Sequence, residues 1–430
     1  MITTAYINLW EKRVGAVAWD STTQTASFEY DPKFIATNWE VAPLKMPLSQ
    51  STQIFSFPDL VRNITFKGLP GLLADVLPDK YGSQLINAWL AQNGRPENSL
   101  NPVELLCFIG NRGMGALEFE PIQFKSNKTA FTIEMDNLVH ITQEVLNNRQ
   151  EFETNLNEDE QKALLDILKI GTSAGGARPK AIIAYNEKTG VIKSGQSKAP
   201  KGFNYWLIKL DGVSDSQFGA STGYGRVEMA YYLMAKACGI EMMECRLLEE
   251  NGRAHFMTQR FDREDGDIKH HIQTFCAIQH FDFNNVTSFS YEQLFQTMRL
   301  LRLPYPQAEQ LFRRMVFNVM ARNCDDHTKN FAFRLRRTSE WELAPAYDIC
   351  HAYRPGSEWV SQHALSINGK RNNITKDDLL TIASSMNIKK ASAIIQQISA
   401  VIKNWSDFAA QTDVVPILKD AIKNTLLTFE

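Results

Sequence analysis

The chain has 430 residues, of which 44% are hydrophobic and 22% are charged, and its formal net charge at pH 7 is −2. This composition is typical of a soluble globular protein, and the length predicts two or three packed units instead of a single core. The near-neutral charge supplies no global basic field. It therefore disfavours non-specific binding to nucleic acid, although a local basic patch is compatible with it.

The six cysteines are scattered and form no CxxC pair or metal-finger spacing. This pattern predicts reduced cysteines in a cytosolic protein. The first residues, "MITTAYINLWEKRVGAVAWD", lack the uninterrupted apolar core of a signal peptide, and no stretch of about 18 apolar residues predicts a membrane span. We therefore expect a soluble, cytoplasmic protein without membrane contact.

The first part of the chain, residues 1–122, mixes strand and helix patterns. "TAYINLW" and "VGAVAWD" predict a hairpin around "EKR", and "ASFEYD" predicts a further strand. "GLPGLLADVLPDKYGSQLINAWLAQNG" then predicts a loop followed by a helix. "PVELLCFIG", "NRG" and "ALEFEP" predict a helix, a turn and a strand. These patterns indicate a small α+β domain.

The second part, residues 123–265, begins with two helix patterns and continues with strands. The helices are "FTIEMDNLVHITQEVLNN" and "NEDEQKALLDILKIG", the latter with Asn157 as its predicted N-cap. The strand patterns are "PKAIIAYN", "VIKSG" and "FNYWLIKL", followed by the helix "GRVEMAYYLMAKACGI". "CRLLEENGRAHFMTQRFDR" predicts two strands joined at Asn251-Gly252, a strong hairpin signal.

The third part, residues 266–430, is mainly helical from Tyr291 onward. One apolar helix face is predicted at Leu311, Phe312, Met315, Val316, Val319 and Met320. "FAFRL" and "WELAPAYDI" then predict two strands, with Asp348 at the end of the second. A strand-rich lobe followed by a helical lobe predicts a cleft, a layout that kinases share with many unrelated folds.

Between that helix and the hairpin runs "ARNCDDHTKNFAF". Phosphoryl transfer needs an aspartate that orients the attacking hydroxyl, and an asparagine and a second aspartate that hold Mg²⁺. Asn330 follows Asp325 by five positions, and Asp348 lies 18 further on. The spacing predicts Asp325 as the catalytic residue, with Asn330 and Asp348 as magnesium ligands.

Two other interpretations of this loop remain open at this point. Asp325, Asp326 and His327 alone are compatible with a solvated polar turn, or with a metal-hydrolase site. The metal-hydrolase interpretation is weakened because the remaining histidines lie in unrelated contexts, where we expect surface or packing roles. They are His140, His255, His270, His271, His280, His351 and His363.

A glycine-rich segment, "GTSAGGARPKA" from Gly171 to Ala181, leaves a helix and enters a strand. Backbone N–H groups of such a loop can close around phosphates, although the segment matches no standard phosphate-binding motif and a simple turn is the alternative. Arg178 and Lys180 beside it favour an anion. The phosphate-binding candidates are Ser173, Ala174, Gly175, Gly176, Ala177 and Lys180.

Two further segments fit a nucleotide site. Lys209 closes the strand "YWLIKL", where it either solubilises a sheet edge or holds ATP phosphates in an ion pair with Glu228, 19 residues later. "QRFDR" ends the strand-rich lobe. Its backbone could bind an adenine edge with Gln259 and Phe261 nearest the base, or it could be a strand end with a surface Asp/Arg pair.

Taken together, these segments resemble the HipA family of serine/threonine kinase toxins from bacterial HipBA modules, over essentially the whole chain. The resemblance is carried by "LADVLPDKYG", "LLCFIGNRGMGAL", "SAGGARPK", "WLIKL", "QRFDR", "DDHTKNF" and "PAYDI". The most specific pair is "DDHTKNF" with "PAYDI". The resemblance implies a two-lobed, protein-kinase-like α+β fold with a small N-terminal α+β domain (1–122), a kinase N-lobe (123–265) and a helical C-lobe (266–430).

The resemblance also implies ATP and Mg²⁺ as cofactors. It makes Asp325 the catalytic aspartate and Lys209 the ATP-phosphate lysine, with His327 and Lys329 of the same loop contacting the nucleotide. Family members autophosphorylate a serine in the glycine-rich loop, which expels the loop and switches the enzyme off. Ser173 occupies the matching place, with Thr172 as the neighbouring alternative.

The partners that the resemblance implies are an aminoacyl-tRNA synthetase as substrate and a HipB-like helix-turn-helix antitoxin, through which DNA is bound. "SAGGARPK" is richer in glycine and arginine than the corresponding family loop, and Asp325-Asp326 replaces an Asp-Gly pair. Two alternatives are a phosphotransferase acting on a lipid or small molecule, because lipid kinases use a similar Asp-x-His-x-x-Asn loop, and an operator-binding corepressor with weak activity.

Overall fold

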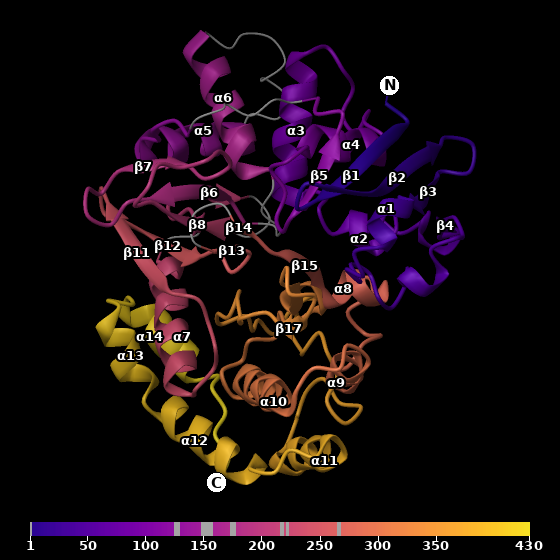
Figure 1. The fold of residues 1–430 in the computed structure, drawn as a ribbon. Coiled ribbons are helices and arrows are strands. Elements are labelled where there is room, and N and C mark those ends of the chain that lie inside the picture. The colour runs from indigo at the N-terminus through magenta and orange to yellow at the C-terminus, as the bar shows by residue number, and fades with distance from the viewer. Residues whose placement is uncertain are drawn as a thin grey trace. The chain divides into compact units, whose positions relative to one another are not determined.

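A computed structural model describes residues 2–123, 130–147, 158–172, 178–215, 219–220, 223–264 and 268–430. The chain forms two compact units (Figure 1). The first comprises Met1–Val41, Met46–Gly225 and Arg246–Ile272, and the second Ala42–Lys45, Arg226–Cys245 and Gln273–Glu430. None of the helices in the described ranges combines the length and the apolar character that crossing a bilayer requires.

The first unit opens with an antiparallel five-stranded sheet in the order β4-β3-β2-β1-β5. Its strands are β1 (Thr4–Leu9), β2 (Lys12–Asp20), β3 (Thr25–Tyr30), β4 (Phe55–Ser56) and β5 (Leu117–Glu120). Alternate residues of β1, namely Ala5, Ile7 and Leu9, are fully buried, as a half-buried strand requires. Helix α4 (Pro102–Ile109) packs against β1, β2 and β5. The predicted hairpin and the predicted helix–turn–strand order are confirmed.

Short and long helices complete this part of the first unit. They are α1 (Pro32–Ile35), η1 (Leu48–Gln50), η2 (Pro58–Leu60), α2 (Gly71–Ala74), α3 (Lys80–Gln92), α5 (Met135–Asn147) and α6 (Glu158–Gly171). Helices α3, α5 and α6 pack together. A Cβ atom at Gly82 would lie 2.8 Å from the carbonyl oxygen of Thr172, so the close approach of α3 and the end of α6 needs glycine there. Asn157, the predicted cap of α6, lies outside the described residues.

A second five-stranded sheet has the order β11-β12-β8-β6-β7. Its strands are β6 (Lys180–Tyr185), β7 (Ile192–Ser194), β8 (Asn204–Lys209), β11 (Cys245–Glu250) and β12 (Arg253–Gln259). The turn between β11 and β12 has positive φ at both Asn251 (45°) and Gly252 (78°), which confirms the predicted hairpin. Two short pairs accompany it, β9 (Ser214–Asp215) with β10 (Gly219–Ala220) and β13 (Arg263–Glu264) with β14 (Ile268–Lys269).

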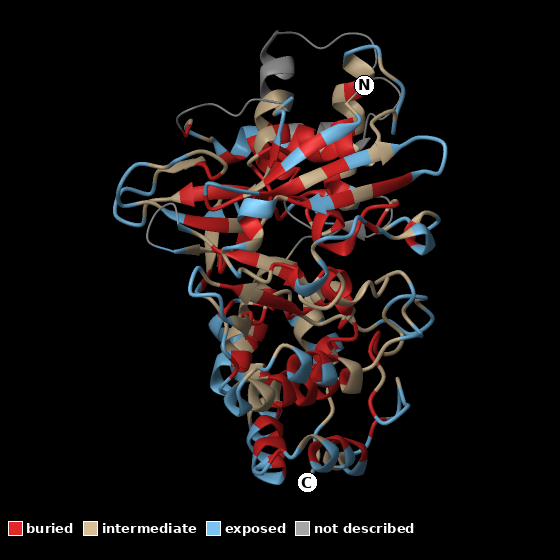
Figure 2. Cartoon of the chain, turned by 45° about the vertical axis from the view of Figure 1, so that its right-hand side comes forward, coloured by how far each residue is buried: buried red, intermediate tan, exposed pale blue. Residues whose placement is uncertain are grey.

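The second unit is mainly helical. Its elements are most of α7 (Tyr224–Ala237), α8 (Phe275–Gln279), α9 (Tyr291–Leu300), α10 (Tyr305–Met320), η3 (Thr328–Asn330), β16 (Ala332–Leu335), β17 (Trp341–Leu343), α11 (Lys376–Met386), α12 (Ala391–Lys403), α13 (Trp405–Gln411) and α14 (Pro416–Lys423). The chain passes from the first unit to the second within β15 (His271–Thr274). Helix α10 packs against α9, α11 and α12, and every residue of its predicted apolar face is fully buried. Figure 2 shows buried residues, in red, along strands and helices of the chain.

Candidate active site

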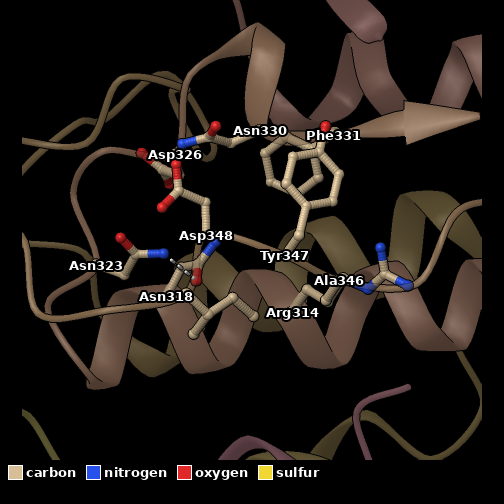
Figure 3. A pocket seen from close by; sticks show the side chains of 10 residues that line it. Arg314, Asn318, Asn323, Asp326, Asn330, Phe331, Ala346, Tyr347 and Asp348 are labelled. Carbon is tan, nitrogen blue, oxygen red and sulfur yellow. Dashed lines mark hydrogen bonds between the residues drawn. The ribbon is translucent and has the colours of Figure 1, made fainter. Parts of the chain in front are cut away.

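The candidate site begins where α10 ends and the chain turns back toward β16. Arg322 has a left-handed backbone (φ 57°), which turns the chain out of the helix. The backbone N–H of Asn323 donates to the carbonyl of Asn318 at 2.9 Å, and its side-chain amide donates to the Asn318 side-chain oxygen at 3.0 Å (Figure 3). The predicted place of the loop, between a helix and a hairpin, is confirmed.

The two adjacent aspartates of this loop lie in opposite environments. Asp326 is buried, and its Oδ2 accepts a hydrogen bond from the hydroxyl of Tyr291 at 2.8 Å and lies 2.9 Å from Nδ1 of His363. Its Oδ1 accepts from the backbone N–H of Ala364 at 2.8 Å. The side chain of Asp325, in contrast, is 45% exposed. Asp325 can therefore reach a substrate, whereas Asp326 holds the loop to its surroundings.

His363 belongs to the surroundings of this loop. Burial alone would lower the pKa of its imidazole, but the adjacent Asp326 carboxylate raises that pKa to about 10, so the ring carries a proton on both nitrogens at neutral pH. Burial and then the charge of Asp326 raise the pKa of Tyr291 well above its usual value, so the phenol remains a donor. The prediction that His363 has a role unrelated to the loop is wrong, because the fold closes a separation of 37 residues.

The residues after Asp325 form the short helix η3. His327 caps it, because its Nδ1 accepts a hydrogen bond from the backbone N–H of Lys329 at 3.2 Å. The side-chain nitrogen of Asn330 donates to the backbone carbonyl of Asp325 at 2.7 Å. With that nitrogen committed, the amide oxygen is the atom of Asn330 that can face a ligand. The spacing of five residues thus has a structural reason, since one turn returns the asparagine to the aspartate.

A small pocket lies beside this loop, and Asn330 and Asp348 both line it. Figure 3 shows the side chains of both residues at this pocket. Strand β17 ends at Leu343, and the backbone N–H of Ala346 then donates to the carbonyl of Glu241 at 2.8 Å. Asp348 itself has a left-handed backbone, with φ 54°. The prediction that Asp348 stands at the end of the second strand is wrong: a left-handed turn beyond the strand directs its carboxylate.

The oxygen donors of Asn330 and Asp348 fit a magnesium ion. Mg²⁺ prefers hard oxygen ligands, and in nucleotide sites one or two carboxylates hold it together with phosphate oxygens and water.

Sequence reasoning missed Arg314 and Asn318, which line this pocket from α10. Burial lowers the pKa of Arg314 to about 10. Polar residues within an otherwise apolar helix segment are the signal that could have identified both.

His327 and Lys329, two predicted ATP contacts, share one aromatic ring. The ring centroids of His327 and Phe283 are 5.3 Å apart, and Nζ of Lys329 lies 4.7 Å from the Phe283 centroid. The hydroxyl of Tyr347 donates to the backbone carbonyl of Lys329 at 2.7 Å. Nε2 of His327 is also 3.8 Å from Oδ1 of Asp325. The His327 ring therefore lies near the exposed aspartate, and the Lys329 ammonium lies over the same phenyl ring as His327. The contact of both side chains with ATP stays a prediction.

Lys209 ends β8, the central strand of the second sheet. The interpretation of this lysine as an edge residue is therefore wrong. Its backbone pairs with Lys180 of β6, which is buried, and with Phe256 of β12, whose ring centroid lies 5.8 Å from the Lys209 ammonium. Two lysines paired across neighbouring strands gather positive charge on one face of the sheet. Glu228 is buried on α7 in the second unit, and its ion pair with Lys209 stays a prediction.

The "QRFDR" segment is anchored by Asp262. Its carboxylate is fully buried, pairs with Arg260 at 2.7 Å and with Arg263 at 2.7 Å, and accepts from the backbone N–H of Gly115 at 2.6 Å. Burial alone would raise the pKa of Asp262, but the two guanidinium groups hold it well below its usual range. The alternative of a surface Asp/Arg pair is wrong. The adenine contacts of Gln259 and Phe261 stay predictions.

Most of the glycine-rich loop, Ser173–Ala177, lies outside the described residues. Its first neighbour, Thr172, is fully buried, and its Oγ1 donates to the carbonyl of Leu168 at 2.7 Å. Nη1 of the buried Arg112 reaches Thr172 Oγ1 at 3.4 Å and the Leu168 carbonyl at 3.2 Å. The segment that leads into the loop is thus tied to the N-terminal part of the first unit.

Comparison with known proteins gives a consistent result. The HipA N-terminal domain model matches residues 5–120, and the HipA-like C-terminal domain model matches residues 172–405. A chain of the Shewanella oneidensis MR-1 complex of HipA, HipB and operator DNA is 17% identical with a TM-score of 0.67, over 98% of this chain and 95% of that one. The Helicobacter pylori proinflammatory kinase CtkA is 14% identical over 52% of this chain and 88% of that one, with a TM-score of 0.32, too low to indicate a shared fold. No curated protein matches the chain.

The whole-length structural match confirms the predicted HipA-like α+β fold. The C-terminal family model alone spans more than half of the chain, and the N-terminal model accounts for the first sheet and its helices. The chain therefore belongs to the HipA family.

Proposed function

We propose that this chain is an ATP-dependent serine/threonine protein kinase of the HipA toxin type. The observation that carries the proposal is the exposed carboxylate of Asp325, held one turn from Asn330, which in turn shares a pocket with Asp348. This is the set of groups that positions a hydroxyl nucleophile and a magnesium-bound triphosphate.

In this proposal Asp325 accepts the proton of the attacking hydroxyl. Asn330 and Asp348 would hold Mg²⁺, which when bound neutralises the charge that develops on the phosphate oxygens. Lys209 and Lys180 would contact the phosphates, with Glu228 orienting Lys209. Further ATP contacts are proposed for Gln259, Phe261, His327, Lys329 and the loop Ser173–Ala177.

Self-inhibition by autophosphorylation is proposed at Ser173. Thr172, the alternative acceptor, is fully buried with its hydroxyl donated to Leu168, which supports the serine. A dianionic phosphate on Ser173 would compete with the contacts between the loop and ATP. The transferred phosphoryl group would otherwise go to a protein, for which the family suggests an aminoacyl-tRNA synthetase.

The partner proposed for the chain is a HipB-like helix-turn-helix antitoxin. The structural match to a chain from a solved HipA–HipB–operator complex supports it, and DNA would be bound through that partner. We further propose a cytoplasmic location and the division into 1–122, 123–265 and 266–430 as N-terminal domain, kinase N-lobe and C-lobe.

The test is intact and peptide mass spectrometry of the protein incubated with Mg-ATP, beside the Asp348→Asn variant. We expect phosphate on the peptide that contains Ser173 in the native protein and far less on the variant at the same Mg-ATP concentration and time. Equal phosphorylation of the two proteins would contradict the assigned metal site. Absence of phosphate from both proteins would contradict autophosphorylation and favour a lipid or small-molecule acceptor, or the corepressor role.

A further inference from the structure

The backbone of Asp325 is fixed on both sides by one buried polar network. On its N-terminal side, Asn323 is bonded to Asn318, whose side-chain nitrogen donates to the hydroxyl of Tyr291 at 3.0 Å. That hydroxyl donates to Asp326, on the C-terminal side of Asp325. The network therefore links the two sides of Asp325, while the side chain of Asp325 itself is 45% exposed.

His363 supplies a charge to this network. Its side chain and that of Asp326 are 1% and 0% exposed, and Nδ1 lies 2.9 Å from Oδ2. The neighbouring residue, Ala364, donates its backbone N–H to the other carboxylate oxygen of Asp326. The segment is fixed in turn, since the backbone N–H of His363 donates to the carbonyl of Arg371 at 2.9 Å. Asp326 is thus held by both a charge and a backbone donor of one anchored segment.

We propose that Asp326 and His363 form a positioning pair that sets the orientation of the Asp325 carboxylate for phosphoryl transfer, and that Asp326 does not bind the metal. The inference rests on the proposed function. Asp326 lines the pocket of Asn330 and Asp348, but both of its oxygens are committed to Tyr291, His363 and Ala364. Asp326, bound in this way, holds the loop in place, and its exposed neighbour Asp325 acts on the substrate.

The test compares Asp326→Asn, His363→Asn and the double variant with the native protein in steady-state kinase assays, scaled to the folded fraction. A misplaced catalytic group lowers kcat by up to about 100-fold. We expect kcat to fall by about 10- to 100-fold in each single variant, with KM for ATP unchanged. The double variant should be no slower than the worse single one, because residues that act as one unit are not additive.

Two further variants make the result specific. His363→Leu removes the Nδ1 donor altogether and should be slower than His363→Asn, which keeps a donor near that place. His271→Asn is the matched control, because His271 is equally buried but bonds the carbonyl of Val41; its kcat should match the native value. If His363→Leu does not fold, the Asn variants alone decide the question.

The outcomes separate the two proposals. A native protein that transfers no phosphate from Mg-ATP to any acceptor would overturn the proposed function. An active native protein whose Asn variants keep the native kcat would overturn the positioning pair alone. If the fold-losses in kcat of the two single variants multiply in the double variant, the two residues act independently. That result would also overturn the positioning pair.

Discussion

Asp326 and His363 stand 37 residues apart in the chain, yet their side chains meet at 2.9 Å in the interior. Immediately before Asp326, the side chain of Asp325 is 45% exposed. One carboxylate is thus part of the packed interior and its neighbour is available to a substrate. A substitution of Asp325 should therefore lower activity without unfolding the protein, whereas a substitution of Asp326 should lower stability as well.

Asp325→Ala should abolish phosphoryl transfer without unfolding the protein. General-base catalysis contributes typically about 100- to 10,000-fold, and an exposed carboxylate adds little packing. The measurement is the rate of phosphate transfer from Mg-ATP together with the urea midpoint. Asp420→Asn, which changes an exposed aspartate on α14, is the control and should retain the native rate. Native activity in Asp325→Ala would refute its assignment.

Asp326→Ala should destabilise the second unit strongly. It leaves the His363 imidazolium buried without its counter-charge, and removing one partner of a buried ion pair costs about 3–5 kcal/mol. Urea denaturation monitored by tryptophan fluorescence measures the loss. A change in the free energy of unfolding below about 1 kcal/mol, as is typical of exposed pairs, would show that the pair is not desolvated.

The contribution of His363 to stability should be lost in alkaline solution. The pKa of His363 is about 10 in the folded protein, above the value of about 6.5 expected for an unfolded histidine. The ion pair therefore stabilises the fold fully below about pH 6.5, progressively less as the pH rises, and not at all above about pH 10.

The measurement is the difference in unfolding free energy between native and His363→Asn protein at several pH values between 6 and 10. That difference should shrink as the pH rises. The comparison is best made in a Cys324→Ala background, because the Cys324 thiol lies 3.8 Å from Nε2 of His363 and its contact with the imidazole is thereby removed. A difference that stays constant across this range would contradict the raised pKa.

Asp348→Asn should raise the Mg²⁺ concentration needed for half-maximal activity and lower the maximal rate. The substitution removes the only carboxylate proposed to hold the ion, while asparagine adopts the left-handed backbone that position 348 requires. Magnesium titration of the kinase rate measures the effect, and the thermal midpoint should stay close to the native value. An unchanged magnesium dependence would contradict the proposed ligand set.

Asp262→Ala should destabilise the first unit by about 3–5 kcal/mol, because it strands two buried guanidinium groups, those of Arg260 and Arg263. The matched control is Glu118→Gln, which breaks the partly exposed pair with Lys269 in the same region and should cost less than about 1 kcal/mol. Urea denaturation of both variants gives the comparison. Equal losses in the two variants would contradict the buried character of the Asp262 cluster.

Sequence reasoning succeeded where the geometry is local. The return of Asn330 to Asp325 depends on a single turn, and the β11–β12 hairpin depends on Asn251-Gly252 alone. Both follow from spacing and backbone preference, so they are predictable without knowledge of the rest of the fold.

It failed where the relevant partner is distant in the chain. His363 and Asp326 are 37 residues apart, and Asp262 bonds Gly115 across 147 residues, so no local pattern signals either contact. Lys209 was open to an edge interpretation because strand order is a property of the sheet, and only the topology makes β8 central. Asp348 was expected on a strand because the apolar pattern continues beyond the point where pairing with β16 ends.

The left-handed backbone of Asp348 affects how a mutational survey of this protein would be interpreted. A residue other than glycine, asparagine or aspartate at such a position costs roughly 1–2 kcal/mol in backbone conformation, before any loss of metal binding. Valine or isoleucine would therefore score as damaging through folding alone. Asp348→Gly and Asp348→Asn variants that accumulate to the native protein level but lack kinase activity would separate the role of Asp348 as a metal ligand from its role in the turn.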